Sequence, residues 1–277
     1  MSIMLSITTD YFTSARCPEP YLKRIADAGF THLHWCHQWN TDFIYQDCEI
    51  DQISRWLDDY GLRVNDTHAS SGREKNWMSQ LEYERQAGVE LVKNRIDMTS
   101  RLGGDVIIMH VPQEPEDESE KDAFWSPLLK SLEELEPFSL QHGVRIAIEN
   151  LVPDNFPTIE RLLSEFSPEF LGHCHDSGHG NITGLGLDGL DRCKDRLISL
   201  HLNDNDGKGD LHQLLFQGTV DWEPLADLIA ASSYEKMVSM EVVIKNTGID
   251  DEEEFLAQAF EDGKRFTEMI EKARGGC

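Results

Sequence analysis

Residues 105–149 read DVIIMHVPQEPEDESEKDAFWSPLLKSLEELEPFSLQHGVRIAIE and contain one full repeat of this chain's organisation. An apolar run, DVIIMH, precedes a polar stretch, a segment with helical spacing of apolar residues and a glycine; a second apolar run, VRIAIE, follows. Each run closes on a side chain that can bind a metal, His110 in the first and Glu149 in the second. Apolar runs that alternate with helices in this way predict parallel strands joined by helical crossovers.

The same alternation continues in both directions along the chain. Eight apolar runs are predicted strands: 4–8, 31–36, 62–67, 105–110, 144–149, 170–175, 197–202 and 237–242. Segments with helical periodicity lie at 18–29, 50–61, 88–104, 123–143, 156–166, 187–196, 222–232 and 251–273. Eight such units predict an α/β fold, a single (β/α)8 TIM barrel over residues 1–277, since that fold takes roughly 250 residues. A doubly wound open sheet fits less well, because open sheets seldom place candidate ligands after so many strands.

The charge of the chain limits its partners. Fifty-one acidic residues against 25 basic ones give a net charge of −26, and a field of that sign repels nucleic acid and anionic membranes. Much of the acidic excess lies in residues 114–122, predicted as a solvated loop, and in residues 249–255, predicted as the negatively charged start of a helix.

Two further features of the sequence favour a cytoplasmic location. No stretch approaches the roughly 20 apolar residues that span a bilayer, and the first residues, MSIMLSITTDYF, lack the pattern of a signal peptide. The cysteines are scattered and form no CxxC pair, so reduced thiols are expected. They are Cys17, Cys36, Cys48, Cys174, Cys193 and Cys277.

Four residues at the ends of the last four predicted strands form a candidate metal site. They are Glu149, Asp176, His201 and Glu241. A parallel barrel brings its strand ends together at one mouth, where three carboxylates would repel one another without a cation between them. Three carboxylates and an imidazole suit Mn²⁺, Mg²⁺, Co²⁺ or Zn²⁺. We therefore predict one divalent metal ion per chain.

Five more potential ligands lie near the same predicted mouth, as further metal ligands or as hydrogen-bond donors to a polyhydroxylated substrate. They are His68, His110, His179, Asp210 and His212, the last two within the long aperiodic loop 203–222. Trp35 and Trp39, at the end of the second predicted strand and just after it, are predicted either to pack between barrel and helices or to line a substrate pocket. The chain has no GxSxG or GxxxxGK[ST] motif, which argues against a serine hydrolase and a nucleoside-triphosphate enzyme.

Several of these segments resemble the xylose-isomerase-like barrel superfamily. They are IAIEN (146–150), DSGHGN (176–181), HLNDNDGKGDLHQ (201–213), GTVDW (218–222) and SMEVV (239–243). The superfamily includes sugar-phosphate isomerases and epimerases, inosose dehydratase, hydroxypyruvate isomerase, 3-dehydroshikimate dehydratase and endonuclease IV. One departure is LLFQG, where small-molecule members commonly carry a Pro-Gly-rich stretch; Phe216 stands where a glycine is often seen.

The resemblance implies roles for individual residues. Glu149, Asp176, His201 and Glu241 match the four ligands of single-metal ketose epimerases. The other five potential ligands match the additional ligands of the three-zinc endonuclease.

The resemblance also implies an isomerase or epimerase acting on a small sugar or related polyol. Glu149 and Glu241 would remove and return a proton through a metal-stabilised enediolate. A dehydratase working through the same enolate is an alternative, as is an endonuclease IV-like phosphodiesterase with a zinc cluster. The presence of all nine potential ligands favours the nuclease, and the net charge of −26 disfavours it. A barrel that binds a ligand without catalysis is the third class of function. We expect a small-molecule partner, no nucleic acid and no membrane, with a homo-oligomer left open.

Overall fold

The computed structural model describes residues 3–13, 16–69 and 72–275. Its centre is formed by short strands whose side chains are mostly buried, as their apolar sequences predict. The strands are β1 (Leu5–Thr8), β2 (His32–Trp35), β3 (Arg63–His68), β4 (Val106–His110), β5 (Arg145–Glu149), β6 (Leu171–Asp176), β7 (Leu197–His201) and β8 (Val238–Met240). Each begins and ends within two residues of a predicted strand, so the eight predicted strands are confirmed.

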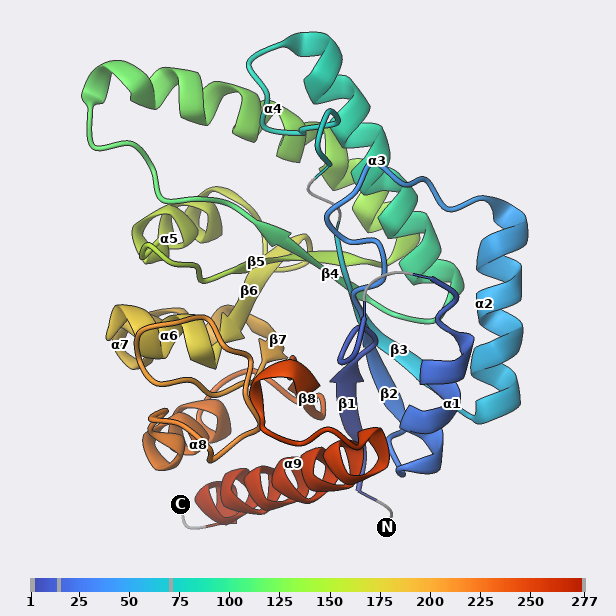
Figure 1. Cartoon of the computed structure of the whole chain (residues 1–277). Helices are drawn as coiled ribbons and strands as arrows, with labels where there is room; N and C mark the ends of the chain where they lie inside the picture. Colours follow the sequence, from blue (N-terminus) through green and yellow to red (C-terminus); the bar gives the residue numbers. More distant parts are fainter. Residues whose placement is uncertain (1–2, 14–15, 70–71, 276–277) are drawn as a thin grey trace.

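The strands form a single parallel sheet in the order β7-β6-β5-β4-β3-β2-β1-β8. The sheet closes through a parallel bridge between Leu202 and Met240, where Leu202 N donates to Ser239 O and Glu241 N donates to Leu202 O, both at 3.0 Å. In Figure 1 the colours run once around this barrel, from blue at β1 and β2 to red at β8 and the last helix. The chain is therefore an α/β TIM barrel, as the sequence predicts.

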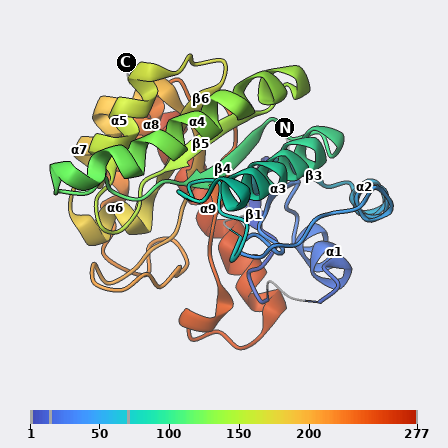
Figure 2. The same cartoon turned by 90° about the horizontal axis from the view of Figure 1, so that it is seen from above.

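Helices surround the strands on the outside. In the described part of the chain they are α1 (Glu19–Asp27), α2 (Asp47–Tyr60), α3 (Glu82–Arg101), α4 (Glu118–His142), α5 (Phe156–Glu165), α6 (Ser177–Thr183), α7 (Gly186–Cys193), α8 (Trp222–Ala230) and α9 (Glu252–Gly275), with short 3₁₀ turns η1 (Lys194–Arg196) and η2 (Ile244–Asn246). Figure 2 shows α3 and α4 side by side along one flank. Apolar side chains between β4 and these two helices, among them Ile107 and Leu132, are fully buried.

The helix boundaries correct the sequence analysis at two places. Residues 114–122 are not wholly a loop, because α4 begins at Glu118, where the Asp117 carboxylate accepts a hydrogen bond from Ser119 N at 2.8 Å. Acidic residues in a first helical turn are favoured by the helix dipole, so the charge that indicated a loop also suits a helix start. Helix α6 was not predicted, because its sequence, SGHGNIT, has no apolar periodicity.

Other predictions concern single residues and termini. Helix α9 starts at Glu252 with an acidic first turn, as predicted for residues 249–255. The five cysteines within the described segments are free thiols, and Cys277 lies outside the described residues. Of the described helices, none combines the length and the apolar character needed to cross a membrane.

Candidate metal centre

The four predicted ligands meet at the carboxyl ends of the strands. Glu149, Asp176 and His201 are the last residues of β5, β6 and β7, and Glu241 directly follows β8. One ligand atom from each lies within 4.8 Å of those of the other three. Glu149, Asp176 and His201 are buried, and Glu241 is partly buried, with 13% of its side chain exposed. The barrel thus gathers three carboxylates and one imidazole, far apart in sequence, at one point of its mouth.

A shift in strand register aligns two of these ligands. The pairing of β6 with β7 runs from His173 opposite Leu197 to Cys174 opposite Ser199, which leaves Ile198 without a partner. After this bulge Asp176 stands opposite His201. Bulges are frequent beside active sites because they re-aim side chains.

The surroundings of His201 fit a cation. Its Nδ1 lies 3.0 Å from Glu241 Oε2 and 3.2 Å from Glu149 Oε2, yet both ring nitrogens are buried without a hydrogen bond among the residues that the structure describes. A buried polar atom without a partner is costly, and such atoms call for an explanation. A divalent ion bound by the imidazole and the carboxylates would supply the missing interaction, and this donor set suits Mn²⁺, Mg²⁺, Co²⁺ or Zn²⁺.

The three carboxylates differ in their pKa values. Burial by itself would raise the pKa of Glu149, but the imidazoles of His201 and His110 lower it well below its usual range. Burial likewise opposes ionisation of Glu241, and His201 outweighs it, so the pKa of Glu241 also falls well below its usual range. Burial raises the pKa of Asp176 to about 6 even though His179 opposes the shift. Crowded carboxylates compete for ionisation here, and a cation would relieve that competition.

Two asparagines that the sequence analysis did not single out hold Asp176 in place. Asn203 Nδ2 donates to Asp176 Oδ2 at 2.9 Å, and the backbone N of His179 donates to Asp176 Oδ1 at 2.7 Å. The side chain of Asn150 brackets the backbone of Asp176, accepting from its N at 2.8 Å and donating to its O at 2.9 Å. Asn150 directly follows Glu149 in IAIEN, and Asn203 lies two residues after His201 in HLN. This closeness to a predicted ligand is the sequence feature from which both asparagines could have been predicted.

The remaining five predicted residues lie around the same mouth in two groups. His110 Nε2 and His68 Nε2 lie 3.1 and 3.8 Å from Glu149 Oε2. On the other side, Asp210 lies 3.4 Å from His179 Nε2 and 3.1 Å from His212 Nε2. His68 and His110 form a group of three with Glu149, and His179, Asp210 and His212 form another; within each group the ligand atoms lie within 4.8 Å of one another. All nine predicted residues therefore contribute to one continuous array of potential ligands.

The loop between β7 and α8 carries two of these residues. His212 has a positive φ of 47°, and its Nδ1 lies 2.8 Å from the carbonyl oxygen of Glu241. Phe216 has a φ of 66°, the left-handed conformation that glycine adopts most readily. Asp204 has a structural role, because its carboxylate accepts hydrogen bonds from Val220 N and Trp222 Nε1.

The two tryptophans of the β2–α2 segment have different roles. Trp35 is 1% exposed and belongs to the core, which is the packing role. Trp39 is partly exposed, and its ring lies 4.3 Å from that of His68 and 5.4 Å from that of His110, between centroids. Trp39 therefore forms an aromatic wall beside the candidate metal centre.

Comparison with known proteins agrees with this architecture. Residues 22–259 match the family described as xylose isomerase-like TIM barrel. The uncharacterized protein y4fM of Sinorhizobium fredii is 32% identical over 279 residues, which cover 91% of this chain and 89% of that protein.

Two solved structures share the fold over nearly their full lengths. A D-tagatose 3-epimerase-like protein superposes with a TM-score of 0.78 at 17% identity, covering 97% of this chain and 98% of the other. The IOLI protein with a binding zinc atom superposes with a TM-score of 0.74 at 14% identity, covering 97% and 98%. At these identities the likeness shows the fold.

Proposed function

The chain belongs to the xylose isomerase-like TIM barrel family, and on that premise we propose that it is a divalent-metal-dependent isomerase or epimerase of a small sugar or related polyol. The observation that carries this proposal is the meeting of Glu149, Asp176, His201 and Glu241 within 4.8 Å at the barrel mouth. The epimerase-like protein and the zinc-containing protein that share its fold support it.

A bound divalent cation would polarise the substrate carbonyl and stabilise the negative charge that develops on oxygen during proton abstraction. The protein's own contribution comes from two glutamates. Glu149 and Glu241 reach the centre from β5 and β8, and both approach His201 Nδ1. One carboxylate removes the proton on the carbon next to the carbonyl, and the other returns a proton to the opposite face.

The substrate that we propose is unphosphorylated. In the described part of the chain, the ion pairs of the nine residues are pairs with one another or with His34, and none involves lysine or arginine. A phosphate group usually requires such cationic partners. Imidazoles and the Trp39 ring suit the hydroxyl groups and the apolar C–H faces of a sugar.

Proton exchange in D₂O tests the reaction. We expect the metal-loaded protein to incorporate deuterium at the epimerised carbon of an unphosphorylated ketose such as D-tagatose, followed by NMR, and to stop doing so after chelation. Loss of water from the substrate instead of inversion would identify the dehydratase alternative. If the metal-loaded protein shows no proton exchange and no turnover with any member of a panel of ketoses and polyols, that result contradicts the proposal.

A second candidate function is a phosphodiesterase with several zinc ions. It is favoured by the two additional ligand groups, His68 with His110 and Glu149, and His179 with Asp210 and His212. The net charge of −26 argues against a DNA substrate, because DNA binding depends on neutralising phosphates.

Elemental analysis and a DNA-cleavage assay separate the two candidates. For the isomerase or epimerase we expect close to one ion per chain after dialysis and negligible binding of abasic duplex DNA, even at low salt. Three zinc ions per chain, with incision of that duplex, would replace our proposal with the nuclease.

A further inference from the structure

A buried histidine–aspartate pair lies inside the barrel beside the candidate metal centre. His34 of β2 and Asp66 of β3 are both 0% exposed, and His34 Nδ1 lies 2.6 Å from Asp66 Oδ1. They face each other because the β2–β3 register shifts between Leu33 and His34, which leaves Asn65 without a partner strand residue. The sequence analysis did not identify this pair.

Asp66 fixes the orientation of the imidazole. Its other oxygen, Oδ2, accepts hydrogen bonds from Asn65 Nδ2, at 2.8 Å, and from Ser199 Oγ. Burial would raise the pKa of Asp66, but His34 lowers it below its usual range, so the carboxylate is ionised. A carboxylate only accepts hydrogen bonds, so His34 Nδ1 donates to Asp66 Oδ1 and Nε2 is turned toward the other neighbours of the ring.

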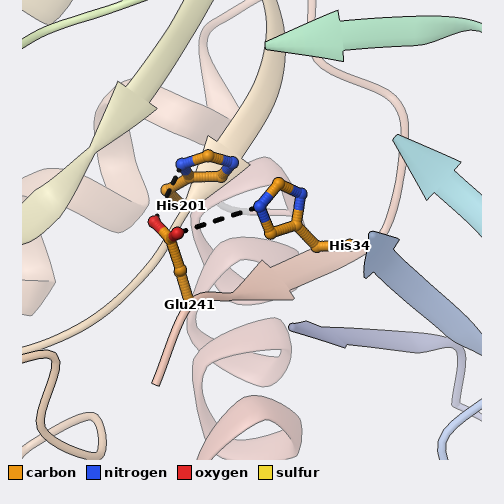
Figure 3. A group of neighbouring side chains, drawn as sticks. All are labelled: His34, His201 and Glu241. Carbon is orange, nitrogen blue, oxygen red and sulfur yellow. Dashed lines mark ion pairs between the residues drawn. The ribbon is translucent and has the colours of Figure 1, made fainter. Parts of the chain in front are cut away.

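The Nε2 side of His34 faces a thiol and Glu241. Cys36 Sγ lies 2.9 Å from His34 Nε2 and 3.6 Å from Glu241 Oε1, and His34 Nε2 lies 3.8 Å from the same oxygen. Figure 3 shows the imidazoles of His34 and His201 around the single carboxylate of Glu241. Oxygen Oε2 faces His201 at 3.0 Å, and Oε1 faces His34 and Cys36.

We propose that Asp66, His34 and Cys36 form a positioning relay that fixes the orientation of Glu241. The relay holds Oε1 against the barrel interior and leaves Oε2 for the metal ion. Free glutamate side chains have several rotamers, and fixing one beforehand removes an entropic cost from metal binding. Burying a carboxylate, an imidazole and a thiol inside a barrel is costly unless these groups are hydrogen-bonded, which is consistent with a role at the site rather than in packing alone.

The inference rests on the proposed function, because it assigns the relay to a ligand of the proposed metal site. His34, Cys36 and Asp66 are positioning residues, since they act through Glu241. Partners that orient a metal ligand typically change metal affinity about 10- to 100-fold when they are removed.

The test measures the dissociation constant for Mn²⁺ by competition with a chelator, on the full chain. Three variants break the relay at different links: Asp66→Asn, His34→Asn and Cys36→Ala. Cys36→Ser keeps a hydrogen-bond donor at the same place. Cys193→Ala removes a buried thiol from α7 and serves as the matched control. Thermal unfolding of each variant verifies that it is folded.

We expect Mn²⁺ binding about 10- to 100-fold weaker in the three relay variants, and within threefold of wild type in Cys36→Ser and Cys193→Ala. Turnover should also fall in the three relay variants. We expect kcat to decrease by a larger factor than KM increases, because a misplaced Glu241 affects proton transfer. Wild-type affinity and kcat in folded Cys36→Ala and His34→Asn would overturn the relay and leave the proposed function intact. A wild-type protein that binds no divalent cation would overturn both.

Discussion

Glu149→Gln is the most direct perturbation of the candidate metal centre, because this carboxylate has the most partners there. Glu149 is 1% exposed, and its oxygens lie 3.1 Å from His110 Nε2, 3.2 Å from His201 Nδ1 and 3.3 Å from His179 Nδ1. Glutamine preserves the size of the side chain and removes its charge. Removing one partner of a buried charged pair costs about 3–5 kcal/mol. We therefore expect Mn²⁺ binding about two to three and a half orders of magnitude weaker.

The assay compares Glu149→Gln with His142→Gln in the dissociation constant for Mn²⁺ and in turnover. His142 lies at the end of α4, where its Nδ1 bonds to the carbonyl oxygen of Phe138 at 2.8 Å. It precedes the first residue of β5, whereas Glu149 is the last residue of that strand. We expect His142→Gln to bind metal and turn over as wild type does, and Glu149→Gln to lose turnover even at saturating metal, since the proposed proton acceptor is gone. Equal losses in the two variants would refute the assignment of Glu149 as ligand and base.

Two further predictions concern stability. Burial raises the pKa of Asp262 to about 6, so the folded protein binds this proton more tightly than the unfolded chain, and stability falls as the pH rises from about 4 to about 6. Asp262→Asn should therefore raise the free energy of unfolding, and the gain should be larger at pH 7.5 than at pH 4 by on the order of 3 kcal/mol. Urea unfolding at the two pH values measures this difference. An equal gain at both pH values would contradict the raised pKa of Asp262. Gly88→Ala should destabilise the protein by about 1–3 kcal/mol, although alanine favours helices, because its Cβ would overlap the backbone nitrogen of Trp77. The control, Gly275→Ala, adds a Cβ with nothing within 4 Å, and a Gly88→Ala protein as stable as this control would show that the contact relaxes freely.

The barrel and most of its mouth could be predicted from the sequence because the signals are local. Most strands are short runs rich in apolar residues, and Glu149, Asp176 and His201 end their strands, so the closure of a parallel barrel is enough to bring them together. Helix α6 could not be predicted, since its glycine-rich sequence has no periodicity and the segment is held by contacts with distant residues, such as the hydrogen bond from Asn205 Nδ2 to Gly178 O.

The partners of the predicted ligands were decided by the tertiary structure alone. His34 and Asp66 look like ordinary polar residues within two strands, and nothing in either run indicates that they meet. They face each other only because a one-residue shift between Leu33 and His34 changes which β3 residue stands opposite. Alternation along a strand makes a side chain's direction depend on register, so a single shift re-aims every later side chain. Register depends on contacts between strands, and the sequence of one strand does not determine it.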